Sequence, residues 1–241
     1  MGFQIRLDKM LSEMSAASRS EVKDLLRTGR LKINEEREKK ADRKVDIEKD
    51  VISLDGTTIE YEAVQYFLLH KPAGFITATE DRTQKTVMEL LPEIRRRDLS
   101  PVGRLDKDTE GLLLITNDGA LAHRLLSPRH HIEKVYYAEI EGLLSEDDEN
   151  AFAQGIDIGD EKPTLPAELK ILSNDELHKS SVAEITITEG RYHQVKRMFE
   201  ALGKKVVYLK RIAMGNLRLP QDLPAGSFIK LTQEEIAQYF E

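Results

Sequence analysis

A polar loop in the middle of the chain carries the residues whose types and spacing best suit chemistry. Residues 102–111 form a glycine-bounded stretch that holds Asp106 and Asp108 directly before the apolar run 112–115. A carboxylate held at the mouth of a rigid sheet can serve as a nucleophile or a general base. The neighbours that could orient it or contact phosphate are Arg104, Lys107 and Thr109. On composition alone, a charged surface turn is the more frequent explanation of such a loop.

The same two aspartates could also supply the acid pair of a glycosidase. Asp106 and Asp108 stand at i and i+2, and this is weak support because the two carboxyl groups of a glycosidase usually come from distant segments. The glycosidase hypothesis therefore stays a minor one.

A second unusual stretch, residues 190–198, places a cationic turn at the start of a predicted helix. Helix amides together with Arg191 would suit a phosphate. Alternatively, Lys196 and Arg197 are ordinary exposed helix residues and His193 is a satisfied polar side chain. For His193 the sequence favours this alternative, because no histidine or carboxylate partner stands at the spacing of metal ligands.

A predicted strand at residues 134–140 adds one aromatic candidate. Alternation places Lys134 and Tyr136 on one face of this strand and Tyr137 on the other. A tyrosine in a strand is more often part of the core than of a catalytic site, so Tyr136 is only a candidate at this point.

Composition excludes several kinds of chemistry. The 241 residues contain no cysteine, which excludes disulfides, thiolate zinc sites and cysteine nucleophiles. No G-x-x-x-x-G-K-[ST] stretch and no G-x-G-x-x-G after a strand is present, so nucleotide hydrolysis and dinucleotide redox chemistry have little support. We therefore expect a reaction that needs no cofactor and no metal.

The charge is distributed unevenly along the chain. The formal net charge of −7 argues against a polyanionic partner, yet residues 141–176 alone hold eleven acids against two lysines. Residues 191–218, the cationic segment, carry eight lysines and arginines against one acid. Nucleic acid thus remains a possible partner, with the acidic segment 141–176 expected to face away from it.

The elements that must position these residues indicate two domains. Apolar spacing predicts a helix over residues 7–14, a capping box at Ser18 and Glu21 starts a second one, and Gly29 ends it. A stripe of four cations follows one side of the second helix: Arg19, Lys23, Arg27 and Arg30. Such a stripe is either an RNA-contacting face or a merely solvated one.

From about residue 60 the pattern changes to strands interrupted by turns and a few helices. We expect strands at residues 66–69, 112–115, 134–140 and 182–188, and helices through Leu126, over 195–202 and after Thr232. Without a regular βαβ rhythm, this predicts an α+β fold, with one domain over residues 1–60 and a second over 61–241. No apolar stretch is long enough for a membrane span, and no apolar targeting core opens the chain, so we expect a soluble, cytoplasmic protein.

Four motifs together resemble a known family. Residues 103–119 read G-R-L-D-K-D-T-E-G-L-L-L-I-T-N-D-G, which is similar to the signature of the bacterial ribosomal RNA pseudouridine synthases of the RsuA type. K-P-A-G at 71–74, E-K-V-Y at 133–136 and G-R-Y-H-Q-V-K-R-M at 190–198 follow the family order. Residues 6–11 and 18–34 resemble the small RNA-binding domain first seen in ribosomal small-subunit protein four. The resemblance covers nearly the whole chain.

The resemblance implies roles for single residues. Asp106 matches the essential aspartate of the family, and Tyr136 matches the tyrosine that packs against the target base. Lys196 matches the basic residue that forms an ion pair with the aspartate. Arg104 matches an arginine that holds the flipped nucleotide. Further RNA contacts are expected from Arg191 and Arg197, and from Arg6, Lys9, Arg19, Lys23, Arg27 and Arg30 in the N-terminal domain.

The implied activity is the isomerisation of a uridine to pseudouridine in ribosomal RNA, with small-subunit (16S) RNA as the favoured target. This reaction needs no cofactor, since one carboxylate can suffice. The implied fold is a small α/β RNA-binding domain followed by a catalytic domain on a mixed, largely antiparallel sheet with flanking helices. We expect a monomer that binds ribosomal RNA within a small-subunit assembly intermediate and does not bind a membrane.

Two alternatives remain, a large-subunit (23S) enzyme of the same family and a non-catalytic ribosome-assembly factor. One departure affects the N-terminal domain. Family members commonly carry Asn-Gly after the second helix, whereas Asn34 is followed here by Glu35. We therefore expect this loop to be reshaped.

Overall fold

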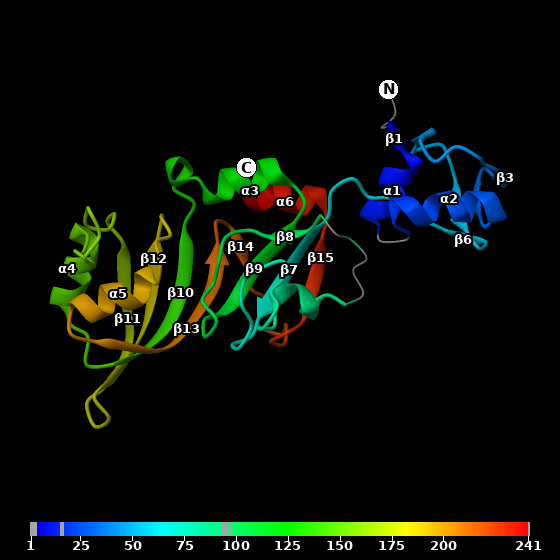
Figure 1. Ribbon diagram of the computed structural model, residues 1–241. Coiled ribbons are helices and arrows are strands. Elements are labelled where there is room, and N and C mark those ends of the chain that lie inside the picture. The colour runs from blue at the N-terminus through cyan, green and yellow to red at the C-terminus, as the bar shows by residue number, and fades with distance from the viewer. Residues whose placement is uncertain (1–3, 15–16, 93–95, 97, 241) are drawn as a thin grey trace. The chain divides into compact units, whose positions relative to one another are not determined.

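The structure is a computed structural model that describes residues 4–14, 17–92, 96 and 98–240. The chain forms two compact units, Met1–Val64 with Pro92–Leu99, and Gln65–Leu91 with Ser100–Glu241. Both combine helices with sheets, which confirms the α+β fold class. Figure 1 shows the elements of each unit in sequence colours.

The N-terminal unit consists of two short helices packed on small antiparallel sheets. Strands β1 and β4 pair with each other, and the other four strands follow the order β3-β2-β5-β6. The elements are β1 (Gln4–Arg6), α1 (Leu7–Glu13), α2 (Arg19–Thr28), β2 (Leu31–Ile33), β3 (Glu36–Arg37), β4 (Lys44–Asp46), β5 (Ile52–Leu54) and β6 (Thr57–Thr58).

The helix α2 begins and ends where its sequence predicts. The Ser18 hydroxyl accepts a hydrogen bond from the Glu21 amide, the Glu21 carboxylate accepts one from the Ser18 amide, and Gly29 ends the helix with φ +71°. Arg30 therefore lies beyond the helix, where its guanidinium binds Asp55 at 2.5 and 2.8 Å. The expected stripe of four cations on one helix side is wrong for Arg30, because the glycine turn carries it off the helix.

The loop that departs from the Asn-Gly pattern still forms a tight turn. Asn34 and Glu35 connect β2 to β3 with φ of +51° and +64°, the left-handed pair that a two-residue hairpin turn requires. The Asn34 side chain also accepts a hydrogen bond from the Val51 amide and donates one to Asp50, each at 2.8 Å. Glu35 thus holds a conformation that glycine adopts without strain, and the expectation of a reshaped loop stays a prediction.

The larger unit is built on one mixed sheet. Its strand order is β11-β12-β10-β13-β9-β7-β15, with β14 beside β13 and β8 beside β9. Among the described strands, β13 and β9 pair in parallel and the other pairs are antiparallel. The strands are β7 (Tyr66–Lys71), β8 (Ser100–Pro101), β9 (Glu110–Thr116), β10 (Lys134–Glu141), β11 (Glu168–Asp175), β12 (Ser180–Ile187), β13 (Lys205–Met214), β14 (Leu217–Arg218) and β15 (Phe228–Leu231).

Helices cover this sheet in two groups. They are η1 (Val87–Leu90), α3 (Gly119–Leu126), η2 (Pro128–His130), α4 (Glu146–Gln154), α5 (Gln194–Ala201) and α6 (Gln233–Phe240). The helices α3 and α6 lie together over β7 and β9, where Leu121 and Ile236 join one buried cluster with Leu112 (Figure 1). The helices α4 and α5 meet through the rings of Phe152 and Phe199, whose centroids are 5.0 Å apart. No described helix has the length and apolarity to cross a bilayer.

The strand β9 is the central strand that the apolar run predicts. Residues 112–115 are all buried, with β13 on one side of the strand and β7 on the other. Gly111, with φ +107°, lets the backbone of β13 pass closely, since a Cβ atom there would lie 2.2 Å from the Arg211 carbonyl oxygen. The end of the polar loop is therefore fixed to two strands.

Candidate active site

A buried lysine donates hydrogen bonds to the main chain of the polar loop between β8 and β9. Lys71, at the end of β7, is fully buried, and its ammonium donates to the carbonyl oxygens of Asp106 at 3.0 Å and Thr109 at 2.7 Å. It also donates to the carbonyl of Pro72 at 3.1 Å. Burial lowers the pKa of Lys71 to about 8, against the opposing effect of nearby carboxylates. The ammonium thus fixes the main chain of the polar loop at Asp106 and at Thr109.

Further bonds fix the loop from the side. The hydroxyl of Thr77 donates to the Leu105 carbonyl at 2.7 Å and accepts from the Leu105 amide at 3.1 Å. The Gly74 amide donates to the Lys107 carbonyl at 2.7 Å. Asp106 therefore stands on a main chain that is bonded on either side of it, as preorganised catalysis requires.

Two basic side chains from the start of α5 face the Asp106 carboxylate. Lys196 Nζ lies 3.2 Å from Oδ2, and His193 Nε2 lies 3.4 Å from Oδ1. The Asp106 side chain is 28% exposed, so the carboxylate remains open to a substrate. The structure thus brings Asp106 and Lys196 together, although they are far apart in sequence.

Lys196 is shared between two carboxylates. Its ammonium also lies 2.6 Å from Asp108, whose side chain is 75% exposed. Burial alone would raise the pKa of Asp108, but the bond and charge of Lys196 outweigh it and lower that pKa. Burial likewise opposes the charge of Lys196, and the two aspartates overcome it and raise the lysine pKa. Lys196 therefore stays charged near neutral pH, which favours the ionised form of Asp108.

The strand register sets the position of Tyr136 relative to the polar loop. Tyr136 lies on β10 opposite Arg211 of β13, and Arg211 lies opposite Gly111, the second residue of β9 and the last of the loop. Two strand spacings of about 4.8 Å thus separate Tyr136 from the end of the polar loop. Lys134 and Tyr136 are both 8% exposed and share one face, as the alternation predicts.

The candidate RNA contacts of the larger unit differ in whether they bind other parts of the protein. Arg191 and Arg197 both bind Asp160, and they also donate to main-chain carbonyls, Arg191 to that of Lys162 and Arg197 to that of Ile158. These two guanidinium groups therefore hold the protein's own loop. Arg104, by contrast, is exposed and makes no hydrogen bond or ion pair with the described part of the chain.

The acidic and cationic segments bind each other. Asp160 pairs with Arg197 at 2.5 Å, and Asp148 pairs with Lys204 at 2.6 Å. These pairs form because α4 and α5 pack against each other and bring opposite charges together. The expectation that the acidic segment faces away from RNA stays a prediction.

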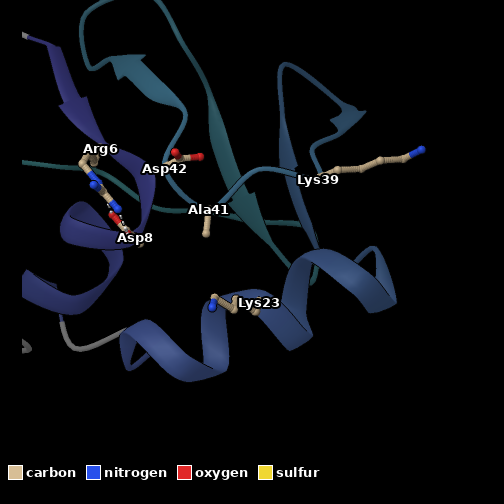
Figure 2. Close-up of a pocket in the computed structure, with 6 residues that line it drawn as sticks. All are labelled: Arg6, Asp8, Lys23, Lys39, Ala41 and Asp42. Atoms are coloured by element: carbon tan, nitrogen blue, oxygen red, sulfur yellow. Dashed lines mark hydrogen bonds and ion pairs between the residues drawn. The ribbon is translucent and has the colours of Figure 1, made fainter.

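Two of the candidate RNA contacts of the N-terminal unit, Arg6 and Lys23, line a surface hollow of about 510 Å³. In Figure 2, Lys23 rises from α2 toward the segment with Ala41 and Asp42. Arg6, on another wall, binds Asp8 through two bonds of 2.7 and 3.0 Å. Of the remaining candidates, Arg19 is exposed, Lys9 lies 3.5 Å from Glu13, and Arg27 lies 3.4 Å from Asp24.

Comparison with known proteins identifies the family of this chain. Residues 65–201 match the model of the RNA pseudouridylate synthases, and residues 5–52 match the S4 domain. The chain belongs to the RNA pseudouridine synthase family. Within this family it is of the RsuA type, as the resemblance predicts.

Whole-chain relatives agree with the assignment. The chain is 42% identical to the ribosomal small subunit pseudouridine synthase A of Yersinia pestis, over 97% of both chains. It is 42% identical to an uncharacterized RNA pseudouridine synthase of Bacillus subtilis (strain 168), over 96% of this chain and 97% of that one. A crystal structure of a pseudouridylate synthase matches with a TM-score of 0.67 at 38% identity, over 98% and 99% of the two chains.

Sequence reasoning missed two residues at this pseudouridine synthase site. Lys71 opens the K-P-A-G motif but was given no role, because a lysine at a strand end gives no sign of burial. His193 was interpreted as an ordinary polar residue, since its partner Asp106 is 87 positions away. Among the described residues, no three histidines or carboxylates gather as metal ligands would.

Proposed function

We propose that this enzyme converts a uridine of small-subunit (16S) ribosomal RNA to pseudouridine, with Asp106 as its catalytic group. The observation that carries the proposal is the fixed Asp106 carboxylate, with Lys196 at 3.2 Å and His193 at 3.4 Å. The small-subunit target rests on the relatives from Yersinia pestis and Escherichia coli (strain K12), both named ribosomal small subunit pseudouridine synthase A.

The chemistry moves the sugar from ring nitrogen 1 to ring carbon 5. The bond between the anomeric carbon and nitrogen 1 breaks, the uracil turns, and the anomeric carbon bonds to carbon 5. Carbon 5 then loses its proton while nitrogen 1 gains one, so atoms and charge balance without a cofactor. The target base must leave its stack before the Asp106 carboxylate can reach it, at a cost of a few kcal/mol. Tyr136 would pack against the extruded uracil, and Arg104 would hold its nucleotide.

A substitution at the carboxylate tests the catalytic assignment. Asp106→Asn removes the negative charge and keeps the size of the side chain, so we expect loss of tritium release from carbon-5-labelled uridine in ribosomal RNA. Binding of that RNA should persist, because the cations remain. Asp108→Asn is the matched control, since Asp108 binds the same Lys196 but is 75% exposed, and it should keep most of the turnover. Retained turnover in Asp106→Asn would refute the assignment.

The target subunit is tested separately. A strain that lacks the gene should lose one pseudouridine from 16S ribosomal RNA, and a loss confined to the large subunit would refute the small-subunit target. We further propose that the enzyme is a cytoplasmic monomer and that its N-terminal unit, which matches the S4 domain, binds a folded assembly intermediate. Assembly particles from that strain should then be better substrates than the naked RNA or the finished subunit.

A non-catalytic assembly factor is the competing function. Binding alone would need the cations of the N-terminal unit but not the contacts around Asp106. Tritium release by the wild-type enzyme separates the two functions, since a pure binder releases none.

A further inference from the structure

An exposed aromatic stack lies beside the candidate catalytic carboxylate. The rings of Tyr192 and His193 are 3.8 Å apart between centroids and only 18° from parallel. Tyr192 is 74% exposed, and no other described tyrosine or phenylalanine is as exposed. One face of the Tyr192 ring is therefore covered by His193, and the other remains available.

The stack is connected directly to the site. His193 Nε2, at the edge of the imidazole ring, lies 3.4 Å from Asp106 Oδ1. A group stacked on the open face of Tyr192 would thus be separated from His193, the carboxylate's neighbour, by the Tyr192 ring alone. The bases of neighbouring nucleotides in one RNA strand are separated by similarly short distances.

The backbone under the stack is fixed before any RNA binds. Arg197 donates to the Tyr192 carbonyl at 3.1 Å, and the Arg191 amide donates to Gln194 at 2.9 Å. Both arginines also bind Asp160. His193 itself has φ +50°, an uncommon backbone conformation that turns the chain into α5. A rigid aromatic surface loses little entropy when a planar group stacks on it.

We propose that Tyr192, supported by His193, is the stacking platform for the nucleobase next to the target uridine. Extrusion of a uridine leaves its neighbour without a stacking partner, and an aromatic ring beside the site replaces that partner. The exposed Arg104 and Lys107 on the polar loop supply positive charge for the phosphates of the same strand. The platform rests on the proposed function, in that it serves a strand whose uridine reaches Asp106.

Kinetics with two substitutions at one position test the platform. Tyr192→Phe keeps the ring and should change kcat/KM less than about twofold, whereas Tyr192→Ala should lower kcat/KM about 5- to 150-fold. The loss should fall mainly on KM for ribosomal RNA from a strain lacking the gene. An alanine variant as active as the wild type would overturn the proposal. A phenylalanine variant as impaired as the alanine variant would do so too, because the hydroxyl and not the ring would then matter.

Fluorescence gives a second readout that does not depend on turnover. The chain contains no tryptophan, so Tyr192→Trp introduces a single tryptophan at the platform. In an Asp106→Asn background, the same RNA should quench this tryptophan through base stacking. Val207→Trp is the matched control, since Val207 is 57% exposed and lines a hollow with the carboxylates of Glu139 and Glu141. Equal quenching at both positions, or none at Tyr192→Trp, would overturn the platform.

The two measurements also separate this proposal from the proposed function. Absence of tritium release by the wild-type enzyme would refute the function, whatever Tyr192 does. Normal release together with an unquenched Tyr192→Trp would refute the platform alone. A fall in kcat without a change in KM in Tyr192→Ala would likewise refute it, because Tyr192 would then act by positioning His193 against Asp106.

Discussion

At the scale of single residues, Asp106 is positioned through its main chain as well as its side chain. Lys71 donates to the carbonyls of both Asp106 and Thr109, so the buried ammonium sets where the carboxylate stands. Lys71→Met keeps the length of the side chain and leaves these carbonyls unbonded. We expect kcat to fall about 100-fold, as small displacements of a catalytic group can cause, with KM little changed. Tritium release measures this, and an unchanged kcat would contradict it.

Lys71 also makes stability depend on pH. Burial lowers its pKa to about 8 from 10.5, and burial together with the charge of Arg211 does the same to Lys134. Between these pKa values the unfolded chain binds more protons, so the free energy of unfolding rises with pH from about 8 to 10.5. Each of Lys71→Met and Lys134→Met should reduce that rise by up to about 1.4 kcal/mol per pH unit. Urea unfolding at about pH 7.5, 8.5 and 9.5 measures it, and an unchanged slope in both variants would contradict it.

These residues also show which parts of the site could be predicted from the sequence and which could not. Asp106 stands out because acids and bases crowd one loop before the most apolar strand, and its pairing with Lys196 follows from the family resemblance. Lys71 and His193 could not be found in this way. Their roles arise from contacts 35 and 87 positions away, which no local pattern encodes.

At the scale of elements, helices with caps and strands with alternating burial could be predicted, whereas β13 could not. This strand, Lys205–Met214, carries charged residues at its first position and in its middle, at Lys210 and Arg211, and only its second half is well buried. Its charges favoured an RNA-binding interpretation of the segment. Its register with β9 and β10, which sets the position of Tyr136 relative to the polar loop, depends on the parallel pairing at Gly111 and not on its own composition.

The turn between β2 and β3 gives a prediction at this scale. Glu35 holds φ +64°, so Glu35→Gly should relieve backbone strain and raise the free energy of unfolding by about 0.5–1 kcal/mol. The Glu35 ion pair with Lys32 spans 3.4 Å at the surface, and its loss costs little. Asn34→Gly is the control at the neighbouring position. It should destabilise the protein, because the Asn34 side chain bonds the Val51 amide. Urea unfolding that shows the same sign for both variants would contradict this account.

At the scale of the whole molecule, the net charge of −7 conceals internal neutralisation. The cationic segment contributes Arg191, Arg197 and Lys204 to ion pairs with the acidic segment, so these charges stabilise the fold. Affinity for RNA should therefore come from cations that have no internal partner, such as Arg104. The net charge of a segment, counted from the sequence, overestimates the RNA-binding surface because it does not show which charged side chains form ion pairs within the protein.

Two matched substitutions distinguish binding cations from structural ones. Arg104→Gln removes an exposed charge that faces no acid in the described chain, so RNA affinity should fall, and the log–log salt slope should shrink by roughly 0.7–0.9 for one lost phosphate contact. Lys204→Met removes a charge bound to the buried Asp148 at 2.6 Å. Its free energy of unfolding should fall by about 1–3 kcal/mol while the salt slope stays unchanged. Salt titrations of RNA binding, together with urea unfolding, measure both effects. If Lys204→Met reduced the slope as much as Arg104→Gln, the cationic segment would be an RNA-binding surface after all, and its pairing with the acidic segment would have to open when RNA binds.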